Sequence, residues 1–192
     1  LTAPMVIPRQ RNAGHTEAVS NARQIGLALF EFDTEYGKFQ DESTIEMVRR
    51  TTGKEMKLGN SSSNDFFRQL LASGIASSER MFYANLPGAR KPDGVTTAKK
   101  ALEKGEVGFS YLAGLSTKGN PGRPLLVAPL IPGTDRFDRS LFDGKAVILR
   151  MDNSATSIII DKDGHALLDG KNVLDPSHPV WGGNPPRLVW PE

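Results

Sequence analysis

The three histidines are the first side chains to consider for catalysis, because histidine is a common general acid or base near neutral pH. They are His15, His165 and His178, widely separated in the sequence. A Ser-His-Asp triad requires a serine, a histidine and an aspartate to meet in space, and sequence order neither shows nor excludes such a meeting. The segment 108–112, Gly-Phe-Ser-Tyr-Leu, lacks the second glycine of a G-x-S-x-G nucleophile motif. We therefore expect surface or turn histidines rather than a catalytic one.

The carboxylates are the next candidates, for metal binding or hydrolysis. Residues 161–164, Asp-Lys-Asp-Gly, have the oxygen donors that begin a calcium loop, but Asn172 stands where an EF-hand needs glutamate. A site that uses Asp169 or Asp175 is the alternative, and an aspartate-rich β-turn is the simpler explanation. The acidic residues around positions 33–42 are a weak match to a glycosidase carboxylate pair, since helix ends are often acidic. We predict no metal and no cofactor.

Three further patterns also speak against an enzyme. The turn at 119–122, Gly-Asn-Pro-Gly, lacks the Gly-Lys-Ser/Thr ending of a phosphate-binding loop. The chain has no cysteine, which excludes thiol catalysis, disulfides and cysteine-ligated zinc. Trp181 lies in a Pro/Gly-rich segment, where it either stacks on a sugar or fills the edge of a core. We favour the core position.

The composition is that of an ordinary globular protein. Apolar residues make up 38% and charged residues 24% of its 192 residues, which suits one domain with a real core or two small ones. The formal net charge of +2 gives no strong field to attract nucleic acid, so we predict no nucleic-acid partner.

The strongest pattern is an amphipathic helix near the N-terminus. Its apolar residues alternate at spacings of four and three, which places them on one helical face: Ala18, Ala22, Ile25, Leu29, Phe32 and Tyr36. We expect the helix to run from near Thr16 to Tyr36, with a possible extension toward Pro8 and with Gly37 as its cap. Gly26 lies inside this helix, where glycine costs about 1 kcal/mol, and its usual explanation is close approach of another backbone. Leu27 and Phe30 lie off the stripe, and they are either ordinary exposed apolar residues or part of a surface for partners.

An apolar run, Leu1–Ile7, precedes this helix. It is far shorter than the roughly 20 residues of a membrane-spanning helix. We interpret it as the end of a hydrophobic membrane segment, with Arg9 and Arg11 marking the interface. The alternative is an apolar terminus without function. The chain then divides into an N-terminal helical stalk, residues 1–36, and a head, residues 37–192.

Two short helices are expected next. The pattern Ser43-Thr-Ile-Glu46 suggests a capping box, and Gly53 closes that helix. A third helix should follow Ser61, with N-capping side chains at 62–65, a buried face formed by 66–71, and an end at Gly74. Residues 84–104 are rich in turns and basic, which predicts an irregular excursion.

The second half of the sequence predicts strands at 107–112, 125–130, 145–150, 155–160 and from 165 to 168. The short link between the third and fourth favours an antiparallel hairpin, and the last three strands together predict a meander. From Asp175 onward the composition predicts loops. The expected fold class is α+β: a long N-terminal α-helix packed on a small antiparallel β-sheet, with one or two extra short helices between them.

The residues of the first helix resemble a known family. The segment 21–29 matches the pattern N-x-[KR]-Q-I-G-L-A-L that follows the hydrophobic half-helix in type IV pilin-like and type II secretion pseudopilin-like proteins. A late hairpin of that family, G-x-x-V-x-x-x-D-G-S-V, is matched at Gly144, Val147, Asp152 and Ser154, whereas Asn153 and Ala155 replace its glycine and valine. Residues 63–83 are similar to one branch of these proteins. The family's peptidase site and the glutamate after it are not in this sequence.

The resemblance implies a structural subunit of a type IV pilus-like or pseudopilus-like filament. Such a protein is anchored in the inner membrane by its N-terminal helix, with the head in the periplasm or on the cell surface, and it assembles with itself and with other pilin-like subunits. The residues expected to pack in assembly, some on the head and some on neighbours, are Ala18, Ala22, Ile25, Gly26, Leu27, Leu29 and Phe30. The alternative is a membrane-anchored surface module that binds glycan or protein through its C-terminal loops.

Overall fold

The long helix α1 (Ile7–Tyr36) is the first element of the computed structural model, which describes residues 7–53 and 55–192 apart from the side chains of 7–13 and 98. The helix includes Pro8, which is tolerated in a first turn because the amide there has no intrahelical partner. At the other end, Gly37 adopts a left-handed φ of 81° and donates its N–H to the carbonyl of Asp33 at 2.7 Å. The predicted glycine cap is confirmed. Leu1 to Val6 of the apolar run lie outside the described residues.

Two short helices follow, α2 (Glu42–Thr52) and α3 (Ser63–Ala72). The capping box of α2 is formed by Asp41 and Thr44, so the predicted box at Ser43 was wrong by two positions. Asp41 is the better cap because its carboxylate accepts two backbone N–H groups. The predicted ends are otherwise confirmed: Gly53 caps α2 in a left-handed conformation, and the Ser62 hydroxyl caps α3.

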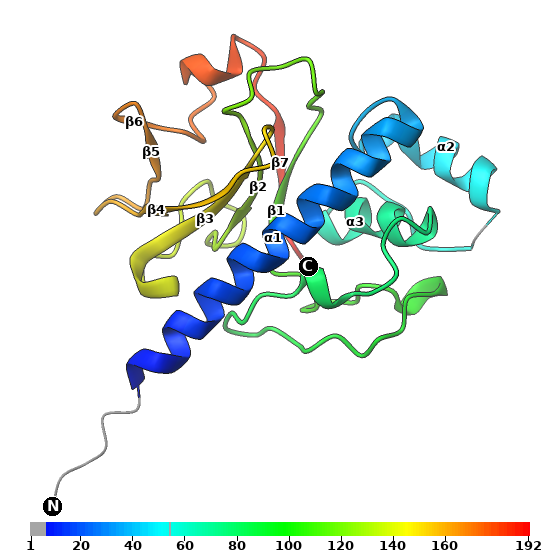
Figure 1. Ribbon diagram of the computed structural model, residues 1–192, viewed down its shortest axis with the longest axis horizontal. Coiled ribbons are helices and arrows are strands. Elements are labelled where there is room, and N and C mark those ends of the chain that lie inside the picture. The colour runs from blue at the N-terminus through cyan, green and yellow to red at the C-terminus, as the bar shows by residue number, and fades with distance from the viewer. Residues whose placement is uncertain (1–6, 54) are drawn as a thin grey trace, which may run out of the picture.

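The main sheet has five antiparallel strands in the order β4-β3-β2-β1-β7 (Figure 1). Strands β1 (Ser110–Ala113), β2 (Pro124–Ala128), β3 (Lys145–Arg150) and β4 (Ala155–Ile159) form a meander in chain order. Strand β7 (Arg187–Val189) returns to pair with β1. The fold is α+β, as the sequence predicted.

One predicted strand is placed differently. The segment after 165 was expected to extend the meander, but β5 (Leu167–Leu168) pairs with β6 (Lys171–Asn172) in a separate two-stranded sheet. An isolated bridge between Ile160 and Ala166 connects it to the end of the preceding strand. The carboxylate of Asp161 accepts the N–H groups of Asp163 and His165, and this turn ends the ladder.

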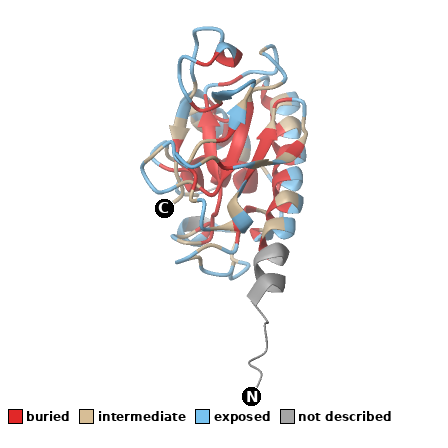
Figure 2. Ribbon diagram, turned by 90° about the vertical axis from the view of Figure 1, so that its left-hand side faces the viewer, coloured by how far each residue is buried: buried red, intermediate tan, exposed pale blue. Residues whose placement is uncertain are grey.

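Both faces of the main sheet are covered, as Figure 2 shows, with α1 along one side and loops on the other. Strand β2 is therefore buried along its whole length. On the α1 side, Leu149 packs against Gly26. On the opposite side, Leu112 lines one cavity together with Leu174 and Trp181 from the segment between β4 and β7.

Candidate functional site

The apolar stripe of α1 is covered by the protein's own head. Four of the predicted packing residues have no exposed surface: Ala18, Ala22, Ile25 and Leu29. The helix lies against β3, β4 and the short helical turns at 80–82 and 142–144. These four side chains therefore hold the stalk helix on the sheet, and their surface is not free for a neighbouring subunit.

Gly26 lies against the β3–β4 hairpin. A Cβ atom built on Gly26 would clash with Oδ1 of Asn153 and lie 3.0 Å from Cδ1 of Leu149. Asn153 holds the hairpin turn with a φ of 64°, a conformation that asparagine tolerates better than most residues. The close approach at Gly26 is thus made by side chains of the same chain, and not by the second backbone that the sequence suggested.

Leu27 and Phe30 are the two predicted residues that reach the surface. Leu27 has 62% of its side chain exposed, the largest value among the apolar residues of α1 whose side chains are described. Phe30 is half-buried and packs edge-on against Phe39, with ring centroids 5.3 Å apart. Leu27 is therefore the one predicted packing residue whose side chain is mainly free in this chain.

Asn21, the first residue of the resembling motif, has a structural contact. Its amide Nδ2 donates to the carbonyl oxygens of Tyr83 at 2.9 Å and of Arg80 at 3.3 Å. The buried amide thereby ties α1 to the turn at 80–82. An asparagine suits this position because its amide group donates to both backbone carbonyl oxygens.

The polar side chains of α3 form a buried network that the sequence did not predict. All ten residues of the helix are buried. Arg68 pairs with Asp65 at 2.6 Å, donates from Nε to the carbonyl of Ala101 at 2.8 Å, and donates from Nη2 to that of Leu102 at 2.7 Å. Asn64 also donates to Leu102. The helix thus fixes the irregular 84–104 excursion by satisfying its carbonyl groups.

A cluster of three carboxylates lies beside this excursion. Ligand atoms of Glu79, Asp93 and Glu106 all lie within 4.8 Å of one another, and Glu79 and Glu106 are fully buried. Burial raises the pKa of Glu79, and the charge of Glu106 adds to that effect. The N–H groups of Leu102 and Gly94 donate to Glu79, and the guanidinium of Arg90 lies 3.0 Å from Glu106. Because protein donors already engage these oxygens, the cluster serves to hold the loop.

The structure brings His15 and Ser157 together. Nε2 of His15 lies 2.8 Å from the hydroxyl oxygen of Ser157, which joins α1 to strand β4. Burial and the charge of Lys145 lower the pKa of His15, while Asp143 acts in the opposite direction. Among the described residues, no carboxylate hydrogen-bonds to the ring of His15, so this pair lacks the third group of a triad.

His178 and Trp181, two candidate residues of the second half, have structural contacts. His178 is buried, with Nδ1 accepting the N–H of Val180 and Nε2 at 2.9 Å from the carbonyl of Leu168. Trp181 is 1% exposed, and its indole N–H donates to the carbonyl of Val173 at 3.0 Å. The predicted core position of Trp181 is confirmed, and its ring is not available to stack on a sugar.

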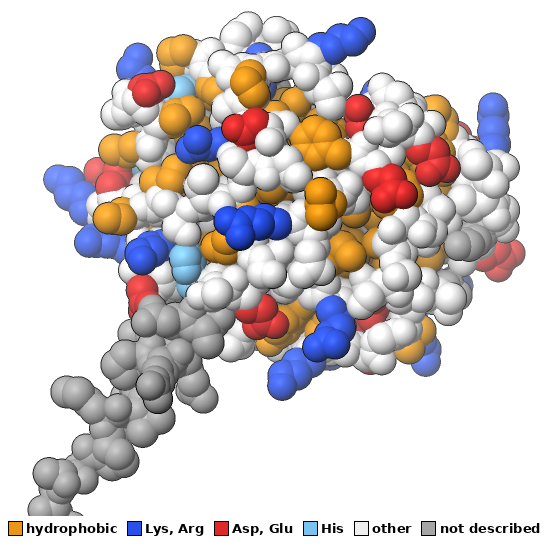
Figure 3. Space-filling view, in the orientation of Figure 1, with side chains coloured by type: hydrophobic (Ala, Val, Ile, Leu, Met, Phe, Trp, Pro, Cys, Tyr) orange, Lys and Arg blue, Asp and Glu red, His pale blue; other side chains and the backbone are white. Residues whose placement is uncertain are grey.

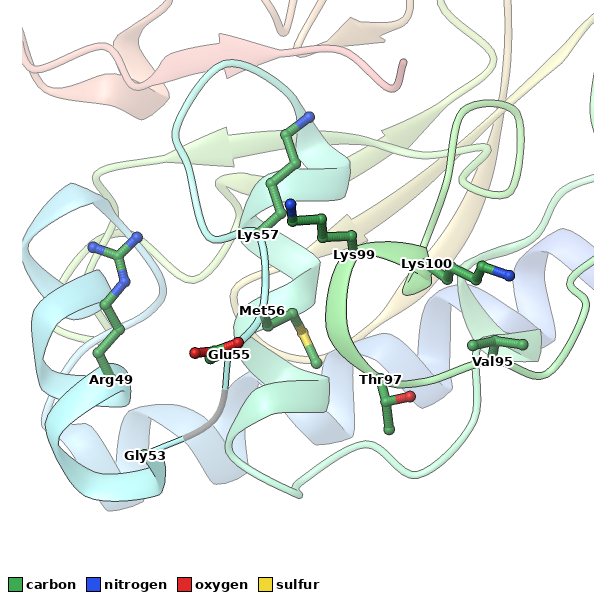
Figure 4. Close-up of a pocket in the computed structure, with 9 residues that line it drawn as sticks. All are labelled: Arg49, Gly53, Glu55, Met56, Lys57, Val95, Thr97, Lys99 and Lys100. Carbon is green, nitrogen blue, oxygen red and sulfur yellow. The ribbon is translucent and has the colours of Figure 1, made fainter.

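An open groove of about 920 Å³ lies between the end of α2 and the segment 95–100 (Figure 4). Met56 and Val95 contribute apolar surface to it. The other lining residues are mainly polar or charged: Arg49, Glu55, Lys57, Thr97, Lys99 and Lys100. Four cations against one carboxylate make the groove electropositive. In the sequence these basic residues lie far apart, at positions 49, 57, 99 and 100, and their convergence depends on the tertiary fold.

In the described part of the chain, no helix combines the length and the apolar composition that crossing a membrane requires. No known protein family, curated protein or solved structure matches this chain.

Proposed function

We propose that this chain is a structural subunit of a type IV pilus-like or pseudopilus-like filament. The observation that carries the proposal is α1: a 30-residue helix, about 45 Å long at 1.5 Å per residue, that leads into the head and buries one stripe on an antiparallel sheet. The resemblance of residues 21–29 to the pilin-like pattern supports it. The function is mechanical, and no chemistry is assigned to the chain.

The division of α1 into two faces suits such a subunit. One face, formed by the fully buried stripe residues, fixes the helix on the head. The opposite face carries Leu27 in solvent, beside polar side chains. In this proposal, the N-terminal part of the helix continues into the membrane segment, and the exposed face of α1 contacts neighbouring subunits, cell-envelope proteins of the same class.

The decisive test is the substitution Leu27→Asp. We expect it to abolish filament assembly by the membrane-anchored protein and to leave the melting temperature of the 192-residue chain unchanged, because the side chain is exposed. Leu167→Asp is the matched control, since Leu167 is also exposed and apolar but lies in β5. Filaments that survive Leu27→Asp would show that this contact is wrong.

A second test is the gene upstream of Leu1. The proposal expects a short basic leader, a small residue, then Phe-Thr-Leu and a glutamate that opens a long hydrophobic run. An ordinary cleavable export signal without such a run would refute the filament proposal.

A further inference from the structure

The end of α1 carries a concentration of negative charge. Glu31, Asp33 and Glu35 lie in the last two turns, where the helix dipole already places about half a negative charge and where cations are preferred. Figure 3 shows carboxylates gathered over this part of the molecule. Among the described residues, none of the three forms an ion pair.

Two of these carboxylates continue a row that begins with Leu27. Leu27, Glu31 and Glu35 follow one another at intervals of four residues, so they lie along one side of the helix, and all three are exposed. The row spans about 12 Å of helix. It presents one apolar side chain followed by two negative charges. Negative side chains at the C-terminal end of a helix are unfavourable with respect to the helix dipole. Where no ion pair offsets them, such charges are typical of a functional surface.

The basic groove has the complementary arrangement. Met56 lies between Arg49 on α2 and the lysines of the opposite side, as Figure 4 shows. Arg49 is partly neutralised by Glu46 at 2.7 Å, and Nζ of Lys57 lies 3.9 Å from Glu192. For Lys99 and Lys100, the described residues provide no ion-pair partner. The groove therefore offers apolar contact together with positive charge that is not paired within the described part of the chain.

We infer that the groove of one copy of this chain receives the exposed row of α1 from a second copy. Leu27 packs on the apolar surface of Met56 and Val95, and Glu31 and Glu35 pair with the lysines. Charge complementarity selects this occupant, because the chain carries both unneutralised partners. The inference rests on the proposed function and deepens it by naming the contact between subunits.

This contact has the symmetry that a filament requires. The acidic row and the groove are different surfaces, so each copy gives one and receives the other. Such a heterologous interface generates a ring if the rotation closes and an open helical assembly if it does not. A self-complementary patch would stop at a dimer.

Charge reversal with mixing tests the inference on the 192-residue chain. In ¹H–¹⁵N spectra recorded at increasing concentration, amide shifts are expected both at 27–35 and around the groove. The double variants E31K/E35K and K99E/K100E should each weaken self-association about tenfold or more, because attractive pairs become repulsive. An equimolar mixture of the two variants should restore binding, since each then offers the surface that the other lacks. Salt at 1 M should weaken the wild-type association.

The control is the double variant K118E/D163K, which changes exposed charges outside both surfaces and should leave association unchanged. Circular dichroism checks that every variant is folded. The inference is overturned if no shifts occur at millimolar concentration, if the shifts map elsewhere, or if mixing fails to restore binding. Filaments of the anchored protein without rescue by mixing would refute only this contact. Rescue without filaments would refute only the filament proposal.

The absence of cysteine allows a second readout. Glu31→Cys mixed with Lys99→Cys should give a disulfide-linked dimer under mild oxidation, whereas Glu31→Cys mixed with Lys118→Cys should not. Equal yields from the two mixtures would contradict the docking. Binding of poly-L-glutamate to the groove in a chain that does not self-associate would also overturn it, because the occupant would then be another acidic polymer.

Discussion

The substitution Gly26→Ala tests whether this glycine serves the chain's own fold or a neighbouring subunit. In an unobstructed helix the change gains about 1 kcal/mol of helix propensity. Here the added methyl group would clash with Oδ1 of Asn153 and lie 3.0 Å from Leu149, and overpacking of this kind costs about 1–3 kcal/mol. We expect a net loss of about 1 kcal/mol, which lowers the melting temperature of a chain of this size by roughly 2–4 °C.

A double-mutant cycle with Asn153→Gly isolates the contact. Glycine accepts the left-handed φ of 64° at that position, and the change removes a buried oxygen without a hydrogen-bond partner. In this background Gly26→Ala should be neutral or stabilising, which gives a coupling energy of about 1–2 kcal/mol. Urea denaturation followed by circular dichroism measures all four chains. If Gly26→Ala stabilises the wild-type chain, or has the same effect in both backgrounds, the packing argument is wrong and the glycine must serve an intermolecular contact.

Three further predictions concern the head. Arg68→Met leaves the buried carboxylate of Asp65 without its ion pair, so the free energy of unfolding measured in urea should fall by about 3–5 kcal/mol, and an unchanged value would contradict the network. The folded pKa of Glu79 is raised above its unfolded value. Its buried charge therefore destabilises the folded state at neutral pH, and this destabilisation is lost as pH falls through the folded pKa. The stability of the wild-type chain relative to Glu79→Gln should therefore rise on acidification from pH 7, and a fall would show the opposite shift. Trp181→Ala should cost about 3–5 kcal/mol, measured by thermal unfolding, since the ring is 1% exposed; a fully stable variant would instead mark a surface residue.

The parts of the fold that could be predicted from sequence are those with periodic burial or a strong local stop. The stripe from Ala18 to Tyr36 specified α1, and Gly37 and Gly53 specified two helix ends through their left-handed backbone. The β3–β4 hairpin followed from two β-rich runs joined by a short link. Each of these signals is local, so tertiary contacts only reinforced it.

The parts that could not be predicted depend on contacts distant in sequence. Strand β7 has three residues in a Pro-rich segment, and it forms because β1 supplies the ladder. The buried positions of Arg68 and Glu79 contradict the usual exposure of charged residues, and their partners at 101–106 follow only from the folded excursion. Neither β7 nor these buried charges could be predicted from the sequence alone.

The candidate site shows the same division. Sequence periodicity placed four of the predicted packing residues on one stripe of α1, whereas Gly26, Leu27 and Phe30 lie off it, and neither observation showed which of the seven the head covers. Packing of α1 on the sheet buries Ala22 and Ile25 and leaves Leu27 exposed. Lys57 and Lys99 lie far apart in sequence and line one groove, which the sequence could not indicate.

The pairing of β7 with β1 also constrains how the chain acquires its structure during synthesis. The carbonyl of Trp190 accepts the N–H of Ser63 at 2.9 Å, and the N–H of Glu192 donates to Asn64. A chain that emerges from a ribosome with its N-terminus first lacks these partners until residues 187–192 have been released. Until then the start of α3 and one side of β1 lack the partners that the closing segment supplies. The head therefore completes its fold only after β7 has emerged. A chaperone that shields β1 would have to stay bound until β7 is available to pair with it.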